Sequence, residues 1–161
     1  MAATYEAIAT TTLGSATSSY TFSSIPSTYT DLVLVASSKL SAADDYIKLR
    51  FNGDTATNYS DIQMMATTSG IDYSKDNNQT ACYVGYINST EFSPLIINIY
   101  NYANATTYKT LTTRNGSTTR IQGIAGLWRK TPEAINSVTI LTSSGNFVTN
   151  STFTLYGIKA A

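Results

Sequence analysis

The side chains able to do chemistry in this 161-residue chain are ten carboxylates and one cysteine, and there is no histidine. The absence of histidine excludes Ser-His-Asp and Cys-His nucleophilic systems and the commonest zinc ligand. A glycosidase needs only two carboxylates. Most of the aspartates, however, fall in predicted loops as turn residues: Asp44, Asp45, Asp54, Asp72 and Asp76. We therefore predict no catalytic residue, no cofactor and no enzymatic activity.

Two of these loops could offer oxygen ligands to calcium. One contains Asn52, Asp54 and Asn58, and the other contains Asp72, Asp76 and Asn77. Neither has the spacing of a known calcium loop. Asn and Asp side chains that hydrogen-bond their own turns are the favoured interpretation, so we predict no metal site.

Tyrosine is abundant, with twelve residues. Tyr59 and Tyr73, in or beside predicted loops, are the candidates for contact with a ligand or a partner. Aromatic faces stack on sugars, and tyrosine is also enriched at protein interfaces, so both interpretations stay open. The single cysteine, Cys82, cannot form an internal disulfide. It lies in an apolar stretch without a basic neighbour, and we expect it to be buried and unreactive.

The charge balance limits the classes of partner. The net charge is zero, and charged residues make up 12% of the chain, about half the usual share. Nucleic-acid binding needs clustered Lys and Arg, which this chain lacks. No apolar run approaches the ~20 residues that span a bilayer. We therefore expect neither a nucleic acid nor a membrane as partner.

Aromatic and β-branched segments separated by turn residues predict an all-β protein. Segment 46–52 alternates cleanly between apolar and polar residues, and segment 32–35 is apolar on both faces, as in a central strand or a strand under a partner chain. One helical turn is predicted at 131–135. The expected strands are 4–9, 19–24, 30–37, 46–52, 59–65, 80–88, 94–101, 108–114, 120–128, 135–142 and 152–159.

This pattern predicts a single domain over residues 1–161 with a jelly-roll-like antiparallel β-sandwich fold. Alternation with polar neighbours selects the residues expected in the core. They are Leu32, Leu34, Leu49, Phe51, Ile97, Ile99, Leu127, Leu155 and Ile158.

Several stretches of the sequence resemble small β-rich virion proteins of tailed bacteriophages, particularly phages of aquatic bacteria such as cyanobacteria. These stretches are YEAIATTTLG at 5–14, FSSIPSTYTDLVL at 22–34, LRFNGD at 49–54 with NYS at 58–60, and FTLYGIK at 153–159. The resemblance covers nearly the whole chain. Its motifs are structural and contain no catalytic chemistry.

The resemblance implies one of two roles. Such domains occur as capsid decoration, or cement, proteins and as tips of tail fibres. Because Met1 directly precedes the domain and no shaft region is evident, we expect a decoration protein on the outer capsid surface. Its expected partners are the major capsid protein and two further copies of itself, as a homotrimer. The alternative is a tail module that recognises a host surface glycan.

Overall fold

The computed structural model describes residues 4–159, which form twelve β-strands and no helix. The all-β prediction is therefore confirmed. None of the described residues belongs to a helix that could cross a membrane. The strands are β1 (Tyr5–Thr12), β2 (Ser19–Phe22), β3 (Asp31–Ser38), β4 (Asp45–Phe51), β5 (Tyr59–Thr67), β6 (Gly70–Gln79), β7 (Cys82–Ile87), β8 (Ser93–Ile99), β9 (Lys109–Gly116), β10 (Arg120–Trp128), β11 (Val138–Thr142) and β12 (Thr152–Ile158).

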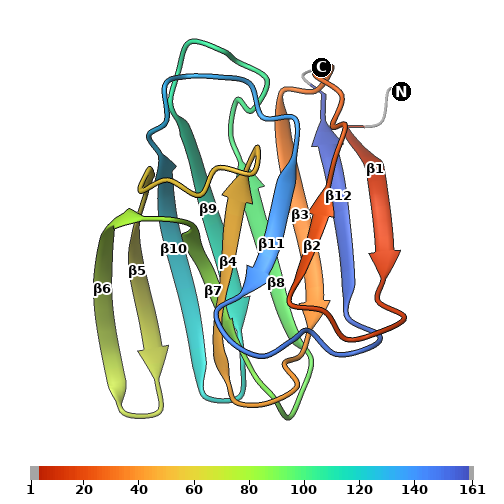
Figure 1. Ribbon diagram of the computed structural model, residues 1–161. Helices are drawn as coiled ribbons and strands as arrows, with labels where there is room; N and C mark the ends of the chain where they lie inside the picture. The colour runs from red at the N-terminus through yellow and green to blue at the C-terminus, as the bar shows by residue number, and fades with distance from the viewer. Residues whose placement is uncertain (1–3, 160–161) are drawn as a thin grey trace.

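The strands form two antiparallel sheets that pack face to face as a jelly-roll-like sandwich. The larger sheet has eight strands in the order β1-β12-β3-β8-β9-β10-β5-β6, and the smaller has four in the order β2-β11-β4-β7. In Figure 1 the smaller sheet lies in front of the larger one, and β5 and β6 form one edge of the molecule. The smaller sheet covers one face of the larger, so the larger sheet has an inner and an outer face.

The core lies between the two sheets and follows the period of two that strands impose. In β4, Ile47, Leu49 and Phe51 are fully buried, while the residues between them are only partly covered. Seven of the nine residues expected in the core are buried. They are Leu32, Leu34, Leu49, Phe51, Ile97, Ile99 and Leu155.

The expectation that Leu127 and Ile158 lie in the core is wrong, because both are only half-buried. In β10 the neighbouring Trp128 takes the inner position, so Leu127 points outward. In β12, Phe153 and Leu155 set the phase of the strand, and Gly157 takes the next inner position. Period-two alternation then turns Ile158 to the outer face.

Two local predictions also fail. Residues 131–135 contain bends but no helical turn. The predicted loop that contains Asp72, Asp76 and Asn77 is instead part of β6, which pairs with β5 through a two-residue turn between Thr67 and Gly70. Segment 32–35 lies in β3 between β12 and β8, as expected of a central strand, but Val35 remains 38% exposed, so the strand is not fully covered on both faces.

Candidate functional site

Tyr59, a candidate for ligand contact, is a core residue, so this prediction is wrong. Its side chain is fully buried and its ring stacks on Trp128 at a centroid distance of 6.3 Å. The Tyr59 hydroxyl accepts a hydrogen bond from the Phe51 backbone N–H at 3.0 Å. Burial raises the pKa of Tyr59 well above its usual value. The residue therefore ties β4 to β5 and has no surface to offer a ligand.

The first candidate calcium loop uses its oxygens to hold itself together. The Asp54 carboxylate accepts hydrogen bonds from the Ala56 N–H at 2.9 Å, the Asn58 amide at 2.8 Å and the Trp128 indole N–H at 2.7 Å. The Asn52 side-chain oxygen accepts two backbone N–H groups, those of Asn136 and Ser137. Asx side chains that stabilise turns account for these contacts.

The second candidate loop lies on strand β6, where alternation separates its side chains. Asp72 and Asp76 lie on one face of the strand, and Asn77, like Tyr73, lies on the other. Among the described residues, no group of three or more His, Cys, Asp or Glu side chains could hold a metal ion. Tyr73 is 80% exposed, so of the two tyrosine candidates only this one has an accessible ring.

Asp61 is the most strongly perturbed carboxyl group of the described residues. It lies on the inner face of β5 and is only 3% exposed. Burial raises its pKa to about 6, although hydrogen bonds from the Gln63 amide at 3.0 Å and the Tyr83 N–H at 3.2 Å oppose this rise. A carboxyl group with this pKa could act as a general acid. Its cover by β7 leaves no route for a substrate.

Gln63 joins Asp61 to a wider buried polar stripe on the inner faces of β5, β9 and β10. The Gln63 amide also contacts Asp76 at 3.4 Å, and its oxygen accepts a hydrogen bond from Gln122 at 2.7 Å. Thr113 and Asn115 continue the stripe and are also buried. Polar side chains thus fill the interior of the sandwich at the β5 end, where apolar ones would be expected.

The opposite, outer face of the same strands is apolar. Five large side chains there are more than half exposed: Ile71 (90%), Tyr73 (80%), Ile121 (68%), Met64 (67%) and Ile62 (60%). The usual pattern of apolar inside and polar outside is therefore inverted at Asp61–Met64 of β5, although Met65 and Ile124 keep the inner face partly apolar. Side chains exposed to this extent present on the order of 700 Å² together, above the ~300–600 Å² of the largest patch on a typical monomer.

Strand pairing arranges the outer face in three rows that run across the strands. One row is Gly116, Ile121, Ala66 and Ile71; the next is Ile96, Arg114, Gly123, Met64 and Tyr73; the third is Asn98, Thr112, Ala125, Ile62 and Lys75. The rows contain two cationic residues and no carboxylate. We call this surface, formed by β8, β9, β10, β5 and β6, the outer apolar face.

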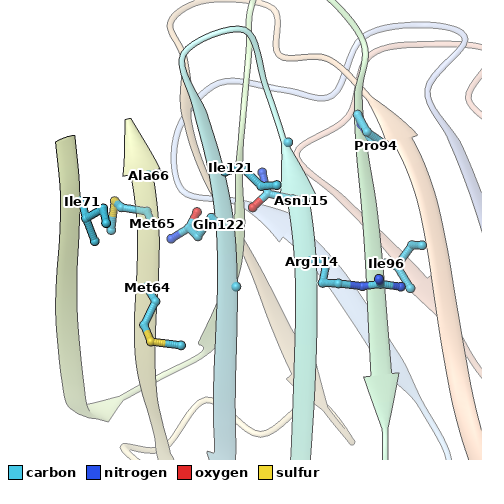
Figure 2. Close-up of a pocket in the computed structure, with 12 residues that line it drawn as sticks. Met64, Met65, Ala66, Ile71, Pro94, Ile96, Arg114, Asn115, Ile121 and Gln122 are labelled. Atoms are coloured by element: carbon cyan, nitrogen blue, oxygen red, sulfur yellow. The ribbon is translucent and has the colours of Figure 1, made fainter. Parts of the chain in front are cut away.

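A groove runs through the outer apolar face, with an open volume of about 710 Å³. Gly116 and Gly123 form part of its floor, because neither has a side chain to fill the space. In Figure 2, Met64 and Ile71 stand on one side, Ile121 lies between, and the Arg114 side chain reaches towards Ile96 on the other side. The groove can receive apolar side chains of a partner.

Sequence reasoning missed this face, although a signal was present. Segment 59–67 carries Ile62 and Met64 in alternation with Asp61 and Gln63, which shows that one face is apolar and the other polar. The alternation alone does not show which face points inward. The usual rule would have turned Ile62 and Met64 into the core.

Comparison with known proteins finds weak structural likeness and no matching family. No protein-family model matches the sequence, and no curated protein matches it. A galectin from Caenorhabditis elegans, LEC-6, superposes with a TM-score of 0.45 at 9% identity, over 94% of this chain and 96% of the galectin. A tetrameric galectin from the sponge Cinachyrella gives 0.38 at 6% identity, over 87% and 99% of the two chains. The alginate lyase Aly36B gives 0.36 at 11% identity, over 81% and 68%. Likeness this low carries no argument about ligands or activity.

Proposed function

We propose that this protein is a structural protein of a bacteriophage virion, a capsid decoration protein that binds the outer surface of the head as a homotrimer. The observation that carries the assembly into an oligomer is the outer apolar face, because an apolar surface of this size on a folded protein marks an interaction site. The resemblance of the sequence to phage virion proteins supplies the biological setting.

The environments of Asp61 and Asp54 support a binding role over catalysis. Asp61, the carboxyl group with the most raised pKa, is sealed under β7. The oxygens of the Asp54 carboxylate are occupied by the turn that contains them. A catalytic pair needs access to a substrate; Asp61 lacks this access, and the Asp54 carboxylate is already engaged by its own turn.

Three-fold assembly would strengthen attachment to the capsid. Each copy needs to contribute only a modest contact, because linked contacts raise the effective concentration of the others. A decoration protein built in this way would bind the shell through uncharged polar and apolar patches. It would not need electrostatic steering, for which this neutral chain has few charges.

Co-sedimentation tests the proposal. The labelled protein should bind preformed phage capsids that lack it, and light scattering should report a mass near three chains. The competing candidate is a receptor-binding tail module, favoured by the exposed ring of Tyr73, on which a sugar could stack. The decoration role would be overturned if the protein does not bind capsids but adheres to host cells, and if Tyr73→Ala abolishes that adhesion.

A further inference from the structure

We infer that the outer apolar face is the contact between copies of this chain, with β6 of one copy packed into the groove of another. The capsid is then bound by a different surface. This inference deepens the proposed function by assigning its self-association to named residues. It requires only that the protein is an oligomer.

The inverted pattern around residues 61–64 of β5 is the first observation behind the inference. A strand that turns Ile62 and Met64 to solvent and buries Asp61 and Gln63 places both sets against their preference. The arrangement becomes favourable when the outer face is itself buried. The sheet would then be covered on both faces, with its apolar side chains in the intermolecular layer.

Shape gives the second observation. Ile71 and Tyr73 on β6 are the most exposed large hydrophobic side chains of the described residues and protrude from the sheet. Next to them the groove has a glycine floor at Gly116 and Gly123. The same surface therefore offers both protruding side chains and a hollow, so one copy can supply the first and its neighbour the second.

The chemistry of the face favours a second copy over the capsid as its occupant. A protein that folds before it meets the capsid must keep its binding surface soluble, and such surfaces are about as polar as the rest of the protein. Interfaces between permanent partners are more apolar. A second copy of the chain is available as a permanent partner wherever the chain folds. The exposed area, on the order of 700 Å², is close to the ~800 Å² per partner of a stable interface.

Two variants test the assignment without disturbing the fold. Ile121→Glu places a carboxylate in the centre of the face, on a side chain that is 68% exposed. Gly123→Val fills the groove floor, and a Cβ there would meet only the Thr113 carbonyl oxygen at 3.8 Å, an ordinary contact. Thr21→Glu, an exposed residue of β2 in the smaller sheet, is the matched control.

Analytical ultracentrifugation supplies the measurement. The parent protein and Thr21→Glu should sediment as the same oligomer, whereas Ile121→Glu should raise the dissociation constant about 100-fold and yield the 17.3 kDa monomer. Gly123→Val should weaken association in the same direction with an unchanged far-UV spectrum. A parent protein that is monomeric, or an oligomer that both variants leave intact, would overturn the inference.

The outcomes separate this inference from the proposed function. A dimer that both variants dissociate supports the inference and contradicts the trimer. Binding of capsids by the Ile121→Glu monomer, weaker than that of the parent, supports both the separate capsid surface and the decoration role. Loss of association with no capsid binding by any form of the protein leaves the self-contact established and removes the decoration role.

Discussion

Asp61→Asn should abolish a pH dependence of stability that the buried carboxyl group creates. The pKa of Asp61 rises from the ordinary aspartate value of 3.8 to about 6 on folding, chiefly through burial. Between these two values the native state holds a proton that the unfolded state has lost. The native state thus binds more protons, and the free energy of unfolding falls as the pH rises through this window.

The magnitude follows from the size of the shift. A shift of roughly two pKa units corresponds to about 3 kcal/mol, and screening by solvent is small because Asp61 is 3% exposed. The contribution is fully present below about pH 4 and lost above about pH 6. Asn cannot ionise. Its side-chain oxygen can still accept the hydrogen bond from Gln63. Its NH2 group then faces the Tyr83 N–H, which is also a donor and loses its acceptor, at a pH-independent cost of about 1 kcal/mol.

Urea unfolding of the parent and Asp61→Asn between pH 4 and pH 7 supplies the assay. The difference between the two proteins is the quantity to follow, because Asp54, Glu133 and Glu6 have lowered pKa values and contribute the opposite slope. Relative to the variant, the parent should lose about 2–3 kcal/mol as the pH rises. Asp72→Asn, which removes an exposed carboxylate of β6, is the matched control. A difference that is flat, or that rises with pH, would refute the burial of an ionisable Asp61.

Three further predictions concern the core. Tyr59→Phe should lower the free energy of unfolding in urea by about 1–2 kcal/mol, because the buried Phe51 N–H loses its acceptor; an unchanged urea midpoint would contradict this. The Cys82 thiol, whose pKa burial raises well above its usual value, should react with a thiol reagent only after denaturant is added; rapid labelling of the native protein would show it to be accessible. Gly126→Ala should lower the melting temperature, with an overpacking cost of about 1–3 kcal/mol, because a Cβ would lie 2.3 Å from the Cys82 sulfur. Gly14→Ala, where no atom lies within 4 Å of the added Cβ, should leave the melting temperature unchanged.

The part of the fold that was predictable from the sequence is the part with a simple inside and outside. In β4, apolar Ile47, Leu49 and Phe51 alternate with cationic residues, and the interior is unambiguous. Where two adjacent residues are both apolar, as at Leu127 and Trp128, the pattern does not choose between them. Asp54, in a turn far away in the sequence, favours Trp128 at the inner position, because its carboxylate accepts a hydrogen bond from the Trp128 indole N–H.

Strand β6 could not be predicted for a different reason. Its sequence from 70 to 79 is rich in Asp, Asn and Ser, which favour turns over strands. It becomes a strand because β5 offers a free edge beside it and the turn after Thr67 brings the chain back in register, with Gly70 at a φ of +139°. Tertiary pairing here overrides local propensity. The predicted ligand loop and the accessible position of Tyr73 both depend on that pairing.

The outward direction of Ile62 and Met64 is a consequence of how the phase of β5 is set. Tyr59 anchors one end of the strand through its hydrogen bond to β4 and its stacking on Trp128. With Tyr59 inside, the period of two places Asp61 and Gln63 inside as well. A slip of one residue would bury Ile62 and Met64, but it would remove Tyr59 from the core and break the Asp61 bond to β7. The position of Tyr59 thus turns Ile62 and Met64 to the surface, and burial between copies of the chain would offset the cost of exposing them.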